Sequence, residues 1–178
     1  MTYNIKNHPT EISINCKAAL DLAAQGFAVF PVHHIMENGE CSCGKKNCSS
    51  PGKHPLTSNG FKSATTDKKQ IIKWWKRWPD ANPGIATGEP SDILVIDVDP
   101  RNGGYETLQS LFDEFGEFLG TLECETGGNG RHYYFKMPPV EPGIKLRSKL
   151  GEGIDVKHDG GYVIAPPSNH ILGGIYKW

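Results

Sequence analysis

The sequence predicts an α+β domain with a mixed but mainly antiparallel sheet and helices on one side. Three observations lead to this fold class. Short apolar runs of strand length recur along the chain, two pairs of these runs are joined by short glycine-containing turns, and helical periodicity is confined to three segments between the runs. With 178 residues, 37% of them hydrophobic, the chain is long enough for one compact domain.

The domain is expected to span residues 15–178, after a polar and unpatterned N-terminal lead-in over residues 1–14. The chain has no apolar run approaching 18 residues and no charged-then-apolar signal near its start. We therefore expect a soluble, cytoplasmic protein without a membrane partner.

A helix and a strand are expected first. The helix is predicted over about residues 15–25, where Asn15 can cap its start and Gly26 can end it. Residues 27–32 form a nearly continuous apolar run, which is typical of a buried strand.

A compact group of cysteines follows, in a loop with few apolar residues. Its spacing presents four candidate metal ligands, Cys41, Cys43, Cys48 and His54. Three thiolates and one imidazole complete the tetrahedral shell of Zn²⁺, so the predicted site is structural, and the metal would order the loop. His33 or His34 could replace His54, and unligated surface cysteines are the alternative. An odd total of five cysteines, three of them clustered, favours metal over disulfides.

The next predicted helix runs from Asp67 to about Arg77 and ends before Pro79. Asp67 and Gln70 resemble a capping box. One face carries an apolar stripe, which indicates core packing rather than a base-stacking platform, and it consists of Ile71, Trp74, Trp75 and Trp78. The lysines around the stripe are possible phosphate contacts.

Charge is distributed unevenly along the chain, although the net charge is only −1. Between residues 44 and 77 there are nine Lys or Arg residues and one acid. Between residues 80 and 125 there are eleven acids and a single basic residue, Arg101. A basic block beside an acidic block is typical of a protein that holds a polyanion near metal-binding carboxylates, whereas two solvated faces of opposite sign are the simpler interpretation.

An apolar strand with two acids is expected at residues 93–99 and is closed by Pro100. Successive side chains of a strand point to opposite faces, so burial of Ile96 and Val98 would place Asp97 and Asp99 together on the other face. Two carboxylates so close repel each other unless a cation lies between them. Taken alone, the pattern also fits a strand that ends in an Asp-rich turn.

The remaining elements are a brief strand and turn over 82–88, an amphipathic helix over 105–115 and two hairpins. The first hairpin pairs 122–125 with 131–137, and the second pairs 154–157 with 162–165. If these strands are neighbours, four side chains converge on one surface: Asp97, Asp99, His132 and Asp155. Three carboxylates suit Mg²⁺ or Mn²⁺, and two such ions can clamp the oxygens of a phosphoryl transfer.

Several motifs occur in a fixed order along residues 18–178: Gly26-Phe27-x-Val29-Phe30-Pro31, Ser50-Pro51-Gly52-Lys53-His54-Pro55, Trp74-Trp75-x-x-Trp78-Pro79-Asp80, Ile96-Asp97-Val98-Asp99-Pro100, Gly130-Arg131-His132-x-Tyr134-Phe135, Gly153-Ile154-Asp155-Val156 and Ala165-Pro166-Pro167-Ser168. Together they resemble the bifunctional primase–polymerase domain of the archaeo-eukaryotic primase superfamily. The resemblance implies a helical and stranded N-terminal unit packed on a sheet related to the RNA-recognition fold.

The resemblance also implies template-directed nucleotidyl transfer onto a 3′-hydroxyl. Asp97, Asp99 and Asp155 would hold two catalytic Mg²⁺ or Mn²⁺ ions, and His132 would bind the triphosphate of the incoming nucleotide. Further phosphate contacts are expected from Arg131, Ser168, Lys145, Arg147 and Lys149. The implied partners are a single-stranded DNA template with its primer, nucleoside triphosphates, and a helicase domain or partner in a larger protein.

Two other function classes fit some of these features. Carboxylates with a histidine also suit a metal-dependent nuclease. A non-catalytic nucleic-acid-binding replication module would need only the basic block, although acids at all three metal positions count against it.

Overall fold

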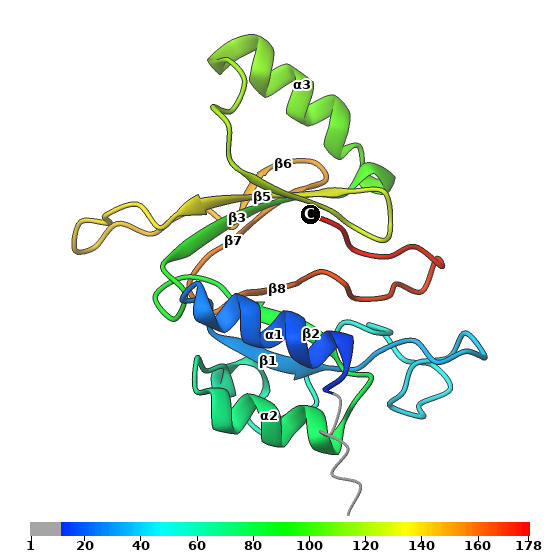
Figure 1. Cartoon of the computed structure of the whole chain (residues 1–178). Helices are drawn as coiled ribbons and strands as arrows, with labels where there is room; N and C mark the ends of the chain where they lie inside the picture. The colour runs from blue at the N-terminus through cyan, green and yellow to red at the C-terminus, as the bar shows by residue number, and fades with distance from the viewer. Residues whose placement is uncertain (1–11) are drawn as a thin grey trace, which may run out of the picture.

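The computed structural model describes residues 12–178, which form two antiparallel β-sheets with helices packed against them (Figure 1). The smaller sheet has the strand order β1-β2-β8, and the larger has the order β4-β5-β3-β7-β6. In Figure 1 the helices α1 and α2 lie beside the smaller sheet, while α3 lies above the larger one. The predicted α+β class is confirmed, but the strands form two sheets and the helices lie at two ends of the molecule.

The smaller sheet is built by three short strands, β1 (Val29–Val32), β2 (Asn82–Ala86) and β8 (Tyr162–Ile164). Helix α1 (Ile14–Ala24) packs on it. Ser13 caps α1, because its side-chain oxygen accepts a hydrogen bond from the backbone N–H of Cys16. The expected cap, Asn15, instead donates its side-chain amide to the carbonyl oxygens of Asp80 and Ala81. Of the predicted lead-in, residues 1–11 lie outside the described residues.

Helix α2 (Lys68–Arg77) follows the short 3₁₀ helix η1 (Gly60–Ser63). Asp67 caps α2 as predicted, since its carboxylate accepts a hydrogen bond from the N–H of Lys69. Trp75 is buried, and Trp74 and Trp78 pack against the same core, so the assignment of the tryptophan stripe to the core is confirmed. The basic residues around the stripe are exposed: Lys68, Lys69, Lys73, Lys76 and Arg77.

The larger sheet is centred on β3 (Ile93–Val98), which lies between β5 (Arg131–Lys136) and β7 (Ile154–Lys157). The edge strands are β4 (Leu122–Glu125) and β6 (Lys149–Gly151). The predicted β4–β5 hairpin is confirmed, with Cys124 opposite His132. Strand β6 was not predicted from the sequence.

The two faces of the larger sheet have different environments. On one face, Ile96 and Val98 pack with Leu108 of helix α3 (Gly104–Phe115). On the other face, Val95 joins a core that includes residues of the smaller sheet. Burial of Ile96 and Val98 is therefore confirmed, and the alternation of the strand turns Asp97 toward the side of the smaller sheet.

The predicted hairpin of 154–157 with 162–165 is wrong. Strand β7 pairs with β3, whereas β8 pairs with β2 of the smaller sheet. The turn between them is fastened to the end of β2, because Thr87 donates its hydroxyl to the carbonyl oxygen of His158 and its N–H to that of Gly161. The chain thus crosses from one sheet to the other at this turn. No helix among residues 12–178 has the length and apolar character that a membrane span requires.

Candidate active site

The register of the larger sheet aligns three polar side chains on one face. Asp97 of β3 is directly opposite His132 of β5 and Asp155 of β7. Directly opposite residues of an antiparallel pair have Cβ atoms about 4.5–5.5 Å apart on the same face. The strand register therefore aligns three of the four residues that the sequence predicted to converge.

Asp97 lies in a strongly polarised environment. Its Oδ1 is 3.4 Å from Nε2 of His132, and its Oδ2 is 3.9 Å from Nζ of Lys157. Burial by itself would raise the pKa of Asp97, but the hydrogen bond and charge of His132, with the charges of Lys157 and Lys53, outweigh it and hold the pKa below its usual value. The carboxylate is thus kept ionised, as a metal ligand must be.

Lys157 lies near both acids that face each other on β3 and β7. Its Nζ lies 2.7 Å from Oδ2 of Asp155. It therefore balances part of the negative charge that two adjacent carboxylates create. Its sharing of a face with Asp155 was visible in the sequence, but its proximity to Asp97 depends on the pairing of the strands.

Asp99 lies just beyond β3, which ends at Val98 rather than at Asp99. Its backbone remains extended, and its side chain caps the 3₁₀ helix η2 (Pro100–Asn102). Arg101 donates to both carboxylate oxygens at 3.0 and 2.8 Å, and Asn102 donates to Oδ2 at 3.0 Å. The hydrogen bond from Arg101, which outweighs a smaller opposing effect of burial, lowers the pKa of Asp99. The N–H of Asp99 donates to the carbonyl oxygen of Gly153, which fixes the loop against β7.

These acids line a cavity of about 730 Å³ between the two sheets. Its charged lining consists of four acids and four cations: Asp97, Asp99, Glu152, Asp155, Lys53, Arg101, Lys149 and Lys157. The turn between β4 and β5 contributes Gly130, where a side chain would collide with the carbonyl oxygen of Val98 at 2.4 Å. The glycine at this turn thus allows the close approach that brings the β4–β5 turn to the rim of the cavity.

Two histidines line the same cavity and are almost completely buried. His132 is 4% exposed, and its Nδ1 has no hydrogen-bond partner among residues 12–178. His170 lies beside the turn of residues 126–130, and burial, followed by the charges of Lys53 and Arg101, lowers its pKa to about 4. His170 is thus neutral at physiological pH.

The other predicted phosphate contacts are divided between positions inside and outside the cavity. Lys149 lines it, whereas Lys145 and Arg147 lie in the exposed loop that precedes β6. Arg131 follows the alternation of β5 onto the opposite face from His132, where it lies 3.4 Å from Glu123. Ser168 is buried, and its hydroxyl donates to the carbonyl oxygen of Ala165 at 2.5 Å.

Sequence reasoning missed several residues of the cavity, namely Lys53, Arg101, Lys157, His170 and Tyr176. Arg101 stood out only as the single cation of an acidic stretch, and Lys53 only as part of a motif and of the basic block. These signals show that a residue is unusual, but its place in the cavity follows from contacts between distant segments.

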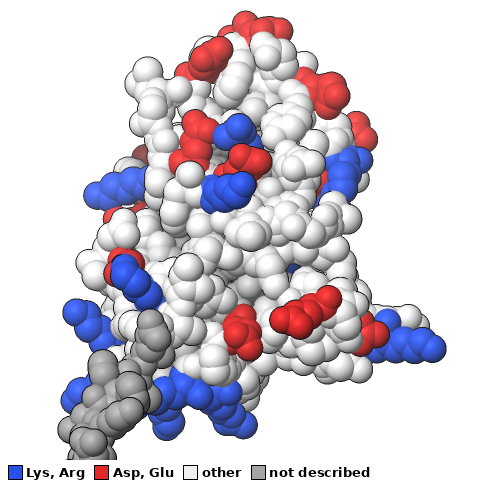
Figure 2. Space-filling view, turned by 45° about the vertical axis from the view of Figure 1, so that its right-hand side comes forward, with Lys and Arg blue, Asp and Glu red and all other residues white. Residues whose placement is uncertain are grey.

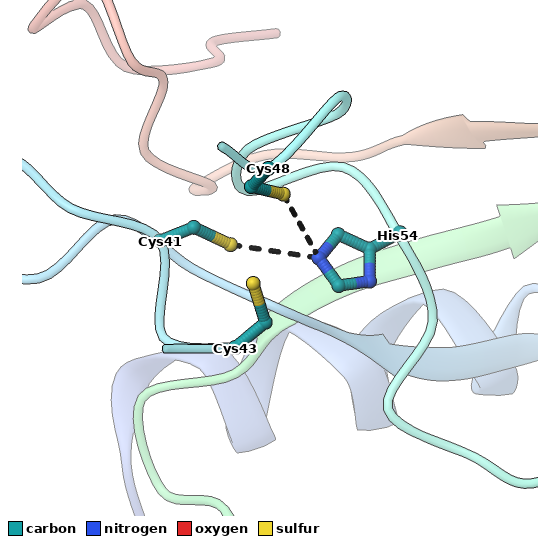
Figure 3. Close-up of side chains that lie close together, drawn as sticks. All are labelled: Cys41, Cys43, Cys48 and His54. Carbon is teal, nitrogen blue, oxygen red and sulfur yellow. Dashed lines mark hydrogen bonds between the residues drawn. The ribbon is translucent and has the colours of Figure 1, made fainter. Parts of the chain in front are cut away.

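A separate cluster of candidate metal ligands, the cysteine cluster, consists of Cys41, Cys43, Cys48 and His54 (Figure 3). Their ligand atoms all lie within 4.8 Å of one another. Nε2 of His54 is 3.5 Å from Sγ of Cys41 and 3.4 Å from Sγ of Cys48. Ligands of a tetrahedral zinc ion lie roughly 3.3–3.8 Å apart, so the group fits zinc.

His54, rather than His33 or His34, belongs to this cluster. The ring of His33 lies against that of His54 at a centroid distance of 4.2 Å and an interplanar angle of 33°, and its Nδ1 lies 2.8 Å from the hydroxyl of Ser42. His33 thus supports the imidazole of His54 from outside.

Figure 2 shows both signs of charge over much of this face, with a group of each sign toward opposite ends of the molecule. Acidic residues gather at the end where α3 lies, and basic residues gather at the end where α2 lies. The five exposed basic residues of α2 contribute to the latter group. Other members of the two charge blocks, such as Lys53 and Asp97, line the cavity instead.

Comparison with known proteins adds one match. The family model described as bifunctional DNA primase/polymerase, N-terminal, matches residues 19–178, which is nearly the whole chain. No curated protein matches the chain.

Proposed function

The chain belongs to the bifunctional DNA primase/polymerase family, and we propose that the cavity between its two sheets catalyses template-directed nucleotidyl transfer. The family supports a primase/polymerase type of function in general. The proposal adds the reaction, in which the 3′-hydroxyl of a primer attacks the α-phosphate of a nucleoside triphosphate. It also adds the residues that would bind the metal ions and the nucleotide. The proposed template is single-stranded DNA, which a helicase domain or partner would supply.

The observation that supports this proposal most strongly is the alignment of Asp97 with Asp155 and His132 across three adjacent strands. Two facing carboxylates with Asp99 at the same cavity form a set of hard oxygen ligands. We propose that they hold two Mg²⁺ or Mn²⁺ ions, which when bound would stabilise the charge that develops on the phosphate oxygens.

The residues of the chain have separate proposed roles. Asp97, whose pKa is held low, supplies an ionised ligand to the reaction centre. Arg101 fixes the orientation of the Asp99 carboxylate through two hydrogen bonds. His132 and Lys149 are proposed to bind the triphosphate, since both line the cavity. Arg131, Ser168, Lys145 and Arg147 are omitted from the site, because none of them lines it.

A primer-extension assay tests the proposal. A labelled primer on a DNA template is incubated with Mn²⁺ or Mg²⁺ and with deoxyribonucleoside or ribonucleoside triphosphates. The wild-type protein should yield longer products, and Asp97→Ala should yield none while its circular dichroism spectrum stays unchanged. Asp92→Asn is the matched control, because Asp92 is an exposed acid next to the other end of β3.

Two outcomes would contradict the proposal. Extension by Asp97→Ala at a rate near that of the wild type would exclude the acid cluster as the reaction centre. Products shorter than the primer, formed without nucleotides, would instead identify a metal-dependent nuclease.

A further inference from the structure

The loop that carries the cysteine cluster also forms part of the wall of the cavity. Ser50 and Lys53 line the cavity, and Lys53 directly precedes His54 of the cluster. We propose that Lys53 binds the phosphates of the nucleoside triphosphate and that metal ligation by His54 sets its position. This inference rests on the proposed function, since it assigns a further binding residue to that reaction.

Three hydrogen bonds hold the backbone of Lys53 and of His54, the residue that follows it. The hydroxyl of Tyr162 in β8 donates to the carbonyl oxygen of Lys53 at 2.9 Å, and the N–H of Lys53 donates to Ser50. The N–H of His33 donates to the carbonyl oxygen of His54 at 2.9 Å, which joins this segment to the end of β1. Lys53 is therefore held between the cysteine cluster on one side and the cavity on the other.

The side chain of Lys53 differs from those of Arg101 and Lys157, two other cations of the cavity, in what it contacts. Arg101 is paired with Asp99 at 2.8 Å, and Lys157 is paired with Asp155 at 2.7 Å. Lys53 forms no ion pair within 4.0 Å in residues 12–178, although Asp97 and Asp99 are close enough to act on its charge. A half-buried ammonium group without a paired carboxylate can donate all its hydrogen bonds to an incoming anion.

The arrangement of charge across the cavity favours a phosphate chain over a smaller anion. The carboxylates of the larger sheet are a site for cations, whereas Lys53 approaches from the cysteine loop on the side of the smaller sheet. A triphosphate is long enough and charged enough to contact bound cations and a separate ammonium group together. Charged hydrogen bonds of this kind change affinity by about tenfold or more.

The cysteine cluster adds to the hydrogen bonds that fix the position of Lys53, because the loop itself has few buried residues. Between residues 41 and 54, only Cys41 and Gly52 are buried. The N–H of Gly52 donates to the sulfur of Cys41, so the residue before Lys53 is itself attached to the cluster (Figure 3 shows the cluster). Metal bound to the four ligands would therefore fix the Gly52–Lys53–His54 segment, and its loss would release the ammonium group from the cavity.

Equilibrium binding measures the contribution of Lys53 without any catalysis. Isothermal titration with dATP and with dAMP, in Mg²⁺ and without DNA, is carried out on the zinc-loaded protein. Lys53→Met should weaken the binding of dATP by about tenfold or more and leave that of dAMP unchanged. Lys46→Met is the control, since Lys46 is an exposed lysine of the same loop that does not line the cavity.

The outcomes separate this inference from the proposed function. If Lys53→Met binds dATP as tightly as the wild type does, Lys53 has no role in phosphate binding, and the proposed function still stands. If the wild type binds no dATP under these conditions, both are overturned.

Linkage tests the role of the metal in setting the position of Lys53. If zinc raises the affinity for dATP, then dATP must raise the affinity for zinc by the same factor. Competition with a chromophoric zinc chelator should show this increase in the wild type and in Lys46→Met, but not in Lys53→Met. An increase that persists in Lys53→Met, or that is absent from the wild type, would overturn the coupling.

Discussion

The cysteine cluster and the carboxylate cluster are assembled from the chain in different ways. The cysteine cluster uses four residues between positions 41 and 54, in a loop where Cys41 and Gly52 are the only buried residues. The carboxylates come from strand β3, from the loop after it and from strand β7, and two of them are direct partners in a sheet. One cluster thus lies in a loop without a core, and the other lies on a sheet with cores on both faces.

This difference determines what a metal ion contributes at each place. In the loop, four side chains converge although burial contributes little, so a bound metal would supply structure. On the sheet, the pairing of strands already holds the carboxylates, so a bound metal would supply chemistry. Loss of ligands should therefore reduce stability at the first cluster and activity at the second.

The largest effect is expected from Asp155→Asn. Because an amide carries no charge to hold a divalent cation, primer extension should fall by about a thousandfold or more. The melting temperature should stay within a few degrees of the wild-type value, since the ladder between β3 and β7 is unaffected. Asp113→Asn, at an exposed site of α3, is the control for loss of a surface acid. A large loss of stability in Asp155→Asn, alongside the loss of primer extension, would mean that the carboxylate cluster also has a structural role and would contradict the difference between the two clusters.

The next largest effect is expected from Cys48→Ser. Loss of one thiolate weakens zinc binding, and the free energy of unfolding should fall by about 3 kcal/mol because the loop loses the contacts that order it. Chemical denaturation monitored by tryptophan fluorescence measures this change, and Ser49→Ala at the exposed neighbouring position is the control. Unchanged stability together with a full complement of zinc would mean that Cys48 is not a ligand.

The same difference explains how much the sequence could predict. The ligands of the cysteine cluster are neighbours in the chain, so their spacing alone indicated zinc, with unligated surface cysteines as the alternative and the choice among three histidines left open. That choice depends on where the end of β1 meets the loop, through the hydrogen bond from the N–H of His33 to His54. The local elements were also predictable, because helical periodicity and caps such as Asp67 are local signals.

The pairing of strands was harder to predict. The turn at residues 158–161 has the composition of a hairpin turn, yet Thr87 draws it across to the smaller sheet. Arg131 is next to His132 in sequence, but the alternation of β5 places it on the opposite face. Lys53 is held at the cavity in part by Tyr162, which is 109 positions away and anchors its backbone. Each of these depends on contacts between distant segments, which short patterns do not encode.

A smaller effect is expected from Lys157→Met, which tests whether the ammonium group of Lys157 offsets the negative charge of the carboxylates in the metal-free protein. Removal of the ammonium group near Asp155 and Asp97 should lower the stability of the metal-free protein by about 1 kcal/mol. Mn²⁺ should then stabilise the variant more than it stabilises the wild type, because no side-chain cation competes for the site. Melting temperatures across a Mn²⁺ titration measure this, with Lys136→Met at the exposed end of β5 as the control. An equal response of both proteins would show that Lys157 and the metal occupy separate positions.

The last effect is expected from His170→Gln, is confined to acidic pH and concerns the pH dependence of stability. Burial, with the charges of Lys53 and Arg101, lowers the pKa of His170 from 6.5 to about 4. The unfolded chain therefore binds a proton at this histidine before the folded chain does, so the contribution of neutral His170 to stability is complete above pH 6.5 and is lost as the pH falls toward 4. Chemical denaturation at several pH values should show a shallower decline for the variant across this window. An unchanged slope would mean that His170 has the same pKa in the folded and unfolded states, in which case burial and the cations of the cavity do not act on it as the structure indicates.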